Sequence, residues 1–163
     1  MRKYIVIALM LMGQISIAQE VTTYYLIRHA EKDRTDLSNQ NPHLTPVGQE
    51  RAKNWQKVFS AVPFDVVYST PYHRTRETAQ PTANAKQLSV ESYDPRNLYN
   101  ASFKAKNDGK IVLVVGHSNT TPALANKILG REKYPQIDDH TNGNLYIIQV
   151  TPRGVTSQLL SIE

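Results

Sequence analysis

Six consecutive apolar or small residues, IVLVVG at 111–116, constrain the fold more than any other stretch of this sequence. A strand that shows no polar alternation is typical of a parallel sheet whose two faces are both covered. Strand-like and helix-like segments alternate on either side of this run, and such alternation predicts an α/β fold. We therefore expect a three-layer α/β/α sandwich built on a mostly parallel sheet.

The expected strands are short runs rich in apolar and β-branched residues. They are residues 22–27, 64–69, 88–93, 111–116, 144–150 and 155–162. The last two flank Pro152-Arg153-Gly154 and predict a hairpin, which would place antiparallel strands at one edge of the sheet. We expect one domain, because 163 residues are too few for two domains of ordinary size.

The expected helices are residues 45–60, 70–85, 98–108 and 121–130. Three of them open with Thr-Pro, where threonine is a good N-cap and proline suits the first helical position. In the first helix, Val47, Arg51, Trp55 and Val58 recur on one face. Pro81 is expected to kink or interrupt the second helix.

The N-terminus has the order of a secretory signal peptide. Arg2 and Lys3 precede the apolar run YIVIALMLM at 4–12, and the small-residue segment Ser16-Ile17-Ala18 follows. Nine apolar residues are too few to span a bilayer. We expect a signal peptide over residues 1–18, a domain over residues 19–163, and a periplasmic or secreted protein without a membrane anchor after cleavage.

Charge and cysteine content exclude several classes of protein. The chain lacks cysteine, which rules out disulfides, thiolate metal sites and a lipoprotein anchor. After removal of residues 1–18 the domain has 17 basic and 14 acidic residues, and these basic residues are scattered. We therefore expect no nucleic-acid partner.

Three predicted strands end in residues that suit phosphoryl chemistry. Arg28 and His29 end the first strand, Arg74 follows the second, and His117 follows the run 111–116. In open α/β sheets, ligands bind at the ends of the strands, so these side chains are expected to converge. Guanidinium groups hold phosphate bidentately, and a neutral imidazole is a competent nucleophile toward phosphorus. Arg28 would then hold the phosphate that His29 attacks.

The same residues belong to a series of short motifs. In chain order these are RHAE at 28–31, LTPVG at 44–48, STPYHR at 69–74 with TA at 78–79, and GH at 116–117. In this order the series resembles the histidine phosphatase superfamily, whose fold is phosphoglycerate mutase-like. The resemblance covers nearly all of the expected mature chain. It implies that His29 becomes phosphohistidine and that Arg28, Arg74 and His117 form the phosphate pocket with it.

The family's usual proton donor has no clear counterpart in this sequence. Many members carry a glutamate in an insertion between the second arginine and the second histidine, but only 42 residues separate Arg74 from His117. The candidate acids are Glu91, Asp94, Asp138 and Asp139, of which Asp94 is favoured because it follows a predicted strand. Compact members, including protein phosphohistidine phosphatases, also lack the usual acid, and a phosphoramidate needs less protonic help than an alkoxide.

Other polar residues near these motifs have structural alternatives. Glu31 is expected to orient an arginine, and Arg76 to be a solvated neighbour of Arg74. Lys32 extends the positive rim or is solvated, and Asn119 binds phosphate or caps the following helix. His43, His73 and His140 are expected at the surface. We expect no metal or cofactor, because no His-x-His or His-Glu-x-x-His spacing occurs.

The resulting expectation is an exported, metal-independent phosphatase that acts on a phosphorylated small molecule or a phosphoprotein. The alternative from another class is a phosphate- or phosphosugar-binding module without turnover. A mutase is disfavoured, because it would need a lid that shields the phosphoenzyme, and the segment lengths leave little room for one.

Overall fold

The structure is a computed structural model that describes residues 21–162. The predicted signal peptide and its cleavage site lie outside the described residues. Within residues 21–162, no helix combines the length and the apolar character that crossing a membrane requires.

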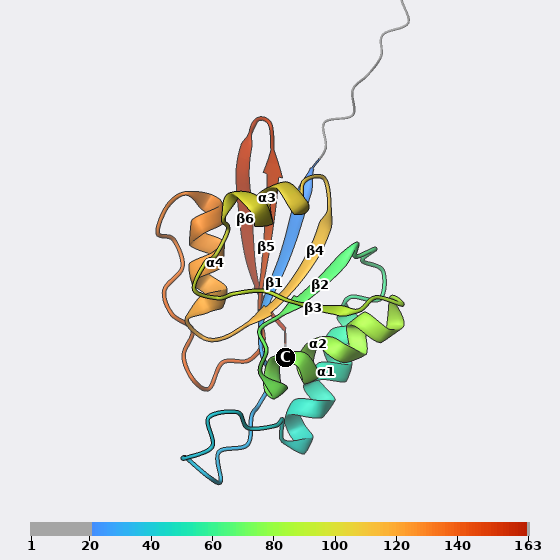
Figure 1. The fold of residues 1–163 in the computed structure, drawn as a ribbon, viewed down its shortest axis with the longest axis vertical. Coiled ribbons are helices and arrows are strands. Elements are labelled where there is room, and N and C mark those ends of the chain that lie inside the picture. The colour runs from blue at the N-terminus through green and yellow to red at the C-terminus, as the bar shows by residue number, and fades with distance from the viewer. Residues whose placement is uncertain (1–20, 163) are drawn as a thin grey trace, which may run out of the picture.

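Within the described residues, strands and helices alternate from β1 to β5, and β6 follows β5 directly (Figure 1). Their bounds are β1 (Thr22–Arg28), α1 (Pro46–Val58), β2 (Val66–Ser69), α2 (His73–Ala85), β3 (Val90–Ser92), α3 (Ala101–Lys106), β4 (Ile111–Gly116), α4 (Thr120–Leu129), β5 (Asn144–Thr151) and β6 (Gly154–Ser161). The strands form one sheet in the order β3-β2-β4-β1-β5-β6.

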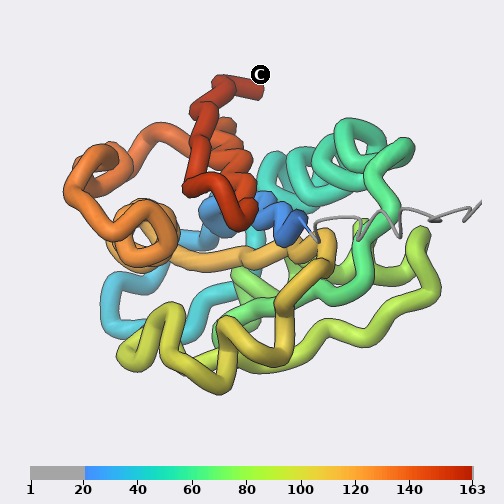
Figure 2. The backbone as a smooth tube through the Cα atoms, turned by 90° about the horizontal axis from the view of Figure 1, so that it is seen from above, coloured from blue at the N-terminus to red at the C-terminus, as the bar shows by residue number. Residues whose placement is uncertain are grey.

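The sheet is parallel through its first four strands and antiparallel at the other edge. β4 pairs in parallel with both β1 and β2, and β2 pairs in parallel with β3. β5 runs antiparallel to β1 and forms the predicted hairpin with β6. Seen along the strands, α1 covers one face of the sheet, while α3 and α4 cover the other (Figure 2). The expected α/β/α sandwich is confirmed.

The two faces of the sheet carry separate apolar cores, as burial on both sides of β4 requires. On one face, Trp55 and Phe59 from the α1 side and Ala79 and Ala83 from α2 pack against the sheet. On the other, Leu124 and Ile128 of α4 and the partly buried Phe103 of α3 pack against it. Val112, Leu113, Val114 and Val115 are at most 2% exposed, so β4 is the buried centre of the fold.

The three Thr-Pro signals have three different outcomes. Thr45 caps α1 through its side chain, as predicted. Thr70 does not cap α2, which begins only at His73, and the cap of α4 is Asn119 rather than Thr121. The predicted start of α2 was therefore wrong, whereas α4 begins one residue before its predicted start and is capped by Asn119, one of the two predicted roles of that residue. Both threonine hydroxyls are used in buried tertiary contacts instead, Thr121 donating to the carbonyl of Ile27 at 3.2 Å.

Two further details of the helices differ from expectation. Pro81 does not interrupt α2, which continues to Ala85. The inward face of α1 is formed by Gly48, Ala52 and Trp55, while Val47 is 63% exposed. The predicted face is shifted because Gly48, not Val47, packs on the backbone of Glu31. A Cβ at Gly48 would lie 2.2 Å from that carbonyl oxygen, so only glycine permits this approach.

Candidate active site

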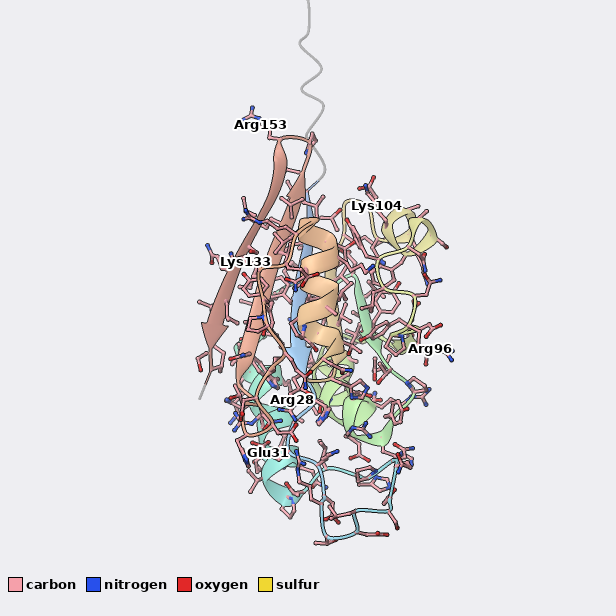
Figure 3. The ribbon with its side chains drawn as sticks, turned by 90° about the vertical axis from the view of Figure 1, so that its left-hand side faces the viewer. Arg28, Glu31, Arg96, Lys104, Lys133 and Arg153 are labelled. Carbon is pink, nitrogen blue, oxygen red and sulfur yellow. The ribbon has the colours of Figure 1, made fainter. Side chains whose placement is uncertain are left out.

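The predicted site residues converge at the carboxyl ends of three neighbouring strands. Arg28 is paired in register with Gly116, and Ser69 is paired with Val115, so β1, β2 and β4 end side by side. Arg28 lies at the lower end of the sheet in Figure 3, whereas Lys133 and Arg153 lie farther up. This is the edge at which open α/β sheets bind ligands.

A cavity of about 530 Å³ opens at this edge. Its lining comes from all three strand ends, the start of α2 and the loops before α3 and after α4. The residues are Arg28, His29, Lys32, Tyr72, Arg74, Pro95, Arg96, His117, Ser118, Asn119, Thr120, Gln136 and Asp139. Four cationic side chains and one carboxylate line it, so the cavity favours an anion.

His29 is held in one tautomer. Its side-chain Nδ1 lies 2.7 Å from the carbonyl oxygen of Ala30, which can only accept, so Nδ1 carries the proton. The lone pair is therefore on Nε2. His29 is 4% exposed, and burial, together with Arg28, His117 and Arg74, lowers its pKa to about 3. At neutral pH the imidazole is thus uncharged and nucleophilic.

Arg28 is buried and anchored by the loop that precedes β5. Its Nη1 donates to the carbonyl oxygens of Asp138 at 2.7 Å and Thr141 at 3.0 Å, and its Nη2 contacts Asp139 Oδ1 at 3.1 Å. Its Nε is buried without a hydrogen-bond partner among the described residues. These three hydrogen bonds fix the guanidinium in place.

Arg74 stands in the first turn of α2, as predicted. Its guanidinium lies over the ring of Tyr72, 4.5 Å from the centroid, and its Nη1 donates to the carbonyl of Gln40 at 3.4 Å. Its Nε, like that of Arg28, is buried and has no partner within residues 21–162. Both guanidinium groups thus belong to residues that line one cavity, and their charge favours an anion there.

His117 faces His29 across the site. The two ring centroids lie 5.4 Å apart, with the ring planes at 69°. Burial and the nearby Arg74, Lys32 and Arg28 lower the pKa of His117 to about 4. Both imidazoles are therefore neutral at pH 7, because burial and, to a lesser extent, the surrounding positive charge disfavour their protonation.

A chain of buried hydroxyls sets the tautomer of His117. Thr75 Oγ1 has one proton, which goes to the carbonyl of Tyr72 at 3.0 Å or to that of Thr70 at 3.1 Å, so Thr75 accepts from Thr70 Oγ1 at 2.8 Å. Thr70 has then used its only proton, and at 2.9 Å it must accept from Nε2 of His117. The neutral His117 ring carries its proton on Nε2 and its lone pair on Nδ1.

Packing explains the spacing of the RHAE and LTPVG motifs. Glu31 accepts two bonds from Arg51 Nε, at 2.8 and 3.0 Å, which confirms its predicted role of orienting an arginine. The carbonyl of Glu31 accepts from the backbone N–H of Thr45 at 2.9 Å, and Gly48 lies against it. The start of α1 is thereby pinned to the segment that follows His29.

The Thr78-Ala79 pair serves the same segment from α2. Thr78 Oγ1 accepts from the backbone N–H of Ala30 at 2.9 Å and donates to the carbonyl of Arg74 at 2.7 Å. Ala79 is fully buried, so α2 packs closely. One hydroxyl therefore connects the backbone beside His29 with the backbone of Arg74.

Comparison with known proteins decides the family. The family model of the histidine phosphatase superfamily (branch 1) matches residues 24–95, which contain the first three motifs. Residues 24–95, and with them the first three motifs, belong to the histidine phosphatase superfamily. No curated protein matches the sequence.

Solved structures of similar fold cover most of the chain. A structure of the protein histidine phosphatase SixA complexed with tungstate has a TM-score of 0.69 at 17% identity. The match covers 85% of this chain and 96% of that one. A phosphoserine phosphatase mutant from Entamoeba histolytica has a TM-score of 0.66 at 16% identity, covering 84% of this chain and 95% of that one. The alpha-ribazole phosphatase of Shigella flexneri gives 0.64 at 18%, covering 86% and 96%. At these identities the likeness shows the fold.

The favoured acid, Asp94, does not line the cavity. It is exposed, and its carboxylate pairs with Arg96 at 3.1 Å. Arg96 donates hydrogen bonds to the carboxylate of Asp94, first from its backbone N–H and then from its side chain, and these bonds lower the pKa of Asp94. Glu91 likewise lies outside the lining and pairs with Lys106. The structure therefore does not bring Asp94 or Glu91 together with His29.

Asp139 is the one carboxylate among the residues that line the cavity. Partial desolvation raises its pKa, but Arg34 and Arg28 outweigh that effect and the net pKa is lowered. Asp138 contributes its backbone carbonyl to Arg28 rather than its carboxylate. None of the four candidate acids is therefore both in the cavity and poised to hold a proton at neutral pH.

For the remaining residues, the sequence predicted two possible roles or a surface position. Asn119 lines the cavity and also caps α4, its side chain accepting from Thr120 N–H at 2.9 Å. Lys32 lines the cavity and so extends the positive rim. Arg76 is exposed, donates to Ser92 and is absent from the lining. His43, His73 and His140 are exposed, as expected.

Four residues of the site escaped sequence reasoning. Thr70 was read as a helix cap, although its hydroxyl serves His117. Buried Asn142 donates to the carbonyl of His29 at 2.9 Å. Arg96 and Tyr72 line the cavity. Asn142 and Arg96 lie in loops, whose packing places them at the site. No periodic pattern in the sequence predicts that packing.

Proposed function

We propose that this chain is a phosphatase that works through a phosphohistidine on His29. One observation carries the proposal: a buried, neutral His29 whose Nδ1–H is fixed on Ala30 lines a cavity with Arg28, Arg74 and His117. Its Nε2 lone pair is the nucleophile. The neighbour that binds tungstate, a tetrahedral oxyanion, is described as a protein histidine phosphatase and supports this reading.

The first step forms a bond between His29 Nε2 and phosphorus and breaks the bond from phosphorus to the leaving group. Arg28 and Arg74 line the cavity, and their guanidinium groups donate to the phosphoryl oxygens. The dianion raises the proton affinity of His117, whose Nδ1 takes up a proton and then donates to a phosphoryl oxygen. Positioning and charge stabilisation supply most of the catalysis of phosphoryl transfer.

The second step returns the enzyme to its starting state. Water attacks the phosphohistidine, the bond between phosphorus and Nε2 breaks, and inorganic phosphate leaves after one proton passes to solvent. His29 regains its lone pair. Neither of these two steps uses a metal ion, in keeping with the metal-independent reaction proposed.

The substrate class follows from the missing acid. An alkoxide leaving group requires a proton donor, and no carboxyl group in the cavity is suited to that role. The imidazole of a phosphohistidine side chain instead leaves as a neutral ring once solvent protonates its other nitrogen. We therefore propose phosphohistidine-containing proteins, or other phosphates with good leaving groups, as substrates of an exported enzyme.

Hydrolysis of an aryl phosphate with and without EDTA tests the proposal. We expect turnover that persists in EDTA and disappears in His29→Ala. Turnover by His29→Ala at a comparable rate would exclude the phosphohistidine route, and a complete loss in EDTA would exclude metal independence.

The second candidate is a phosphate-binding module without turnover. The absence of a poised acid among the cavity-lining residues favours it. Such a protein would bind phosphate or vanadate but would neither hydrolyse aryl phosphate nor form a covalent phosphoenzyme.

A further inference from the structure

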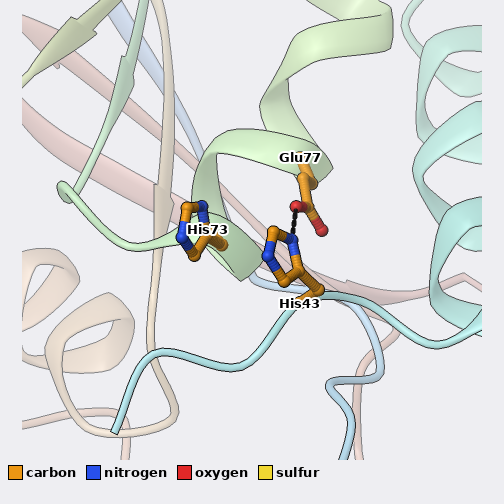
Figure 4. A group of neighbouring side chains, drawn as sticks. All are labelled: His43, His73 and Glu77. Carbon is orange, nitrogen blue, oxygen red and sulfur yellow. Dashed lines mark hydrogen bonds and ion pairs between the residues drawn. The ribbon is translucent and has the colours of Figure 1, made fainter.

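Three potential metal ligands gather on the surface where α2 begins. His73 and Glu77 are one turn apart on α2, and His43 comes from the segment that precedes α1 (Figure 4). One ligand atom from each residue lies within 4.8 Å of the others. Positions i and i+4 share one face of a helix, so His73 and Glu77 point to the same side.

From this cluster we propose a binding site for a divalent transition metal, best fitted by Zn²⁺, with His43, His73 and Glu77 as ligands and water completing the shell. Two imidazoles and one carboxylate are a usual ligand set for zinc. Tetrahedral coordination with bonds of about 2.1 Å places ligand atoms about 3.4 Å apart. The cluster is thus close to the required size before any ion enters.

The backbone around the cluster is already fixed. Asp33 N–H donates to the carbonyl of His43 at 2.8 Å, and His73 N–H donates to Asn41 Oδ1 at 2.8 Å. Glu77 accepts from the N–H of Leu44 at 2.8 Å through one carboxylate oxygen. Its other oxygen contacts Nδ1 of His43. The ligands are therefore brought together by contacts that do not depend on the metal.

Only the exposed rings need to move. The rings of His43 and His73 are stacked, with centroids 4.1 Å apart and planes at 17° (Figure 4). A metal binds in the plane of an imidazole, so rotation of these exposed side chains must replace stacking by convergent lone pairs. The zinc ion would then take the place of the contact between His43 and Glu77.

The metal would join the segment 33–44 to the first turn of α2. Arg74 directly follows His73 and reaches back to Gln40 of the same segment. None of the three ligands lines the phosphate cavity. The metal would therefore lie outside the phosphate cavity and take no part in phosphoryl transfer, and the site stands independently of the proposed function.

Calorimetric titration of Zn²⁺ into the chain purified without a polyhistidine tag tests the site. We expect one equivalent per chain, and at least ten-fold weaker binding in His43→Ala and in Glu77→Gln. The controls are His140→Ala and Glu50→Gln, an exposed histidine and an exposed glutamate outside the cluster, which should bind like the wild type. His29→Ala should also retain binding, because it lacks only the imidazole of the phosphate site.

Cobalt(II) provides a second readout, since imidazole coordination gives a visible absorption band that should vanish in the His43 and Glu77 variants. Melting temperatures of the metal-free variants establish that they are folded; if Glu77→Gln is not, His43→Ala decides. Absence of saturable binding in the wild type, undiminished affinity in His43→Ala, or loss of binding in His29→Ala would each overturn the proposal.

Discussion

The Nδ1 atom of His29 lies 2.7 Å from the carbonyl oxygen of Ala30, and this contact fixes which nitrogen of the ring can react. Since a carbonyl only accepts, the proton is on Nδ1 and the lone pair on Nε2. The backbone of Ala30 is itself held by Thr78, and the carbonyl of His29 by Asn142. The nucleophile is therefore oriented by buried contacts on both sides.

The pH dependence of stability should reflect the two neutral imidazoles. In the unfolded chain histidine titrates near pH 6.5, but the folded pKa values are about 3 for His29 and about 4 for His117. Above pH 6.5 neither state binds protons; below it only the unfolded state does. The free energy of unfolding should therefore fall from about pH 6.5 toward pH 4, by at most about 2 kcal/mol per ring at pH 5.

Urea unfolding at several pH values measures this effect. His29→Ala should lose less stability than the wild type between about pH 6.5 and pH 5, because one of the two rings is gone. Equal pH dependence in the two proteins would mean that His29 titrates normally in the folded state.

Replacement of Thr70 should impair catalysis through His117. Thr70→Val removes the acceptor of His117 Nε2–H, and loss of one such hydrogen bond, about 1.4 kcal/mol, corresponds to about ten-fold in kcat/KM. Thr70→Ser keeps the hydroxyl and should retain most activity. Nitrogen NMR of His117 should show the Nε2–H tautomer in the wild type and a mixture in Thr70→Val. A wild-type ring protonated on Nδ1 would contradict the hydroxyl chain.

The leaving group should govern the rate more strongly than in enzymes with a dedicated acid. We expect aryl phosphates and phosphohistidine to be hydrolysed much faster than alkyl phosphates. A general acid contributes about 100- to 10,000-fold, whereas Asp94→Asn should change kcat/KM by less than about two-fold. A large loss in Asp94→Asn, confined to alkyl substrates, would show that Asp94 reaches the leaving group after all.

Gly48→Ala should destabilise the fold, because its Cβ would lie 2.2 Å from the carbonyl oxygen of Glu31. Such overpacking costs about 1–3 kcal/mol. The neighbouring Val47→Ala, at a side chain that is 63% exposed, should change the free energy of unfolding by less than about 0.5 kcal/mol. Chemical denaturation of both variants measures the difference, and similar values would show that α1 does not depend on the approach of Gly48.

How far the sequence predicts the fold depends on which contacts decide each element. The six strands and four helices were expected because apolar runs and caps are local signals. The outcomes of Thr45, Thr70 and Thr121 show the limit of such signals. Thr45 Oγ1 accepts from the N–H of Gly48 and so caps α1, whereas the hydroxyls of Thr70 and Thr121 contact His117 and Ile27, which are far away in the chain.

The site shows the same division. Arg28, His29, Arg74 and His117 were found because each stands at the end of a strand or the start of a helix, where local pattern fixes position. Asp94 was favoured on the same logic, but the loop that follows β3 directs its carboxylate to Arg96. Asn142 and the metal cluster depend on loops whose course only tertiary packing sets.

Trapping the covalent intermediate tests the central claim most directly. The chain is mixed with labelled substrate, quenched in alkali, in which phosphohistidine survives, and mapped by mass spectrometry. The account predicts an acid-labile phosphate on His29, formed at least as fast as turnover. A hydrolysing enzyme with no phosphate on His29, or with phosphate on another residue, would contradict it.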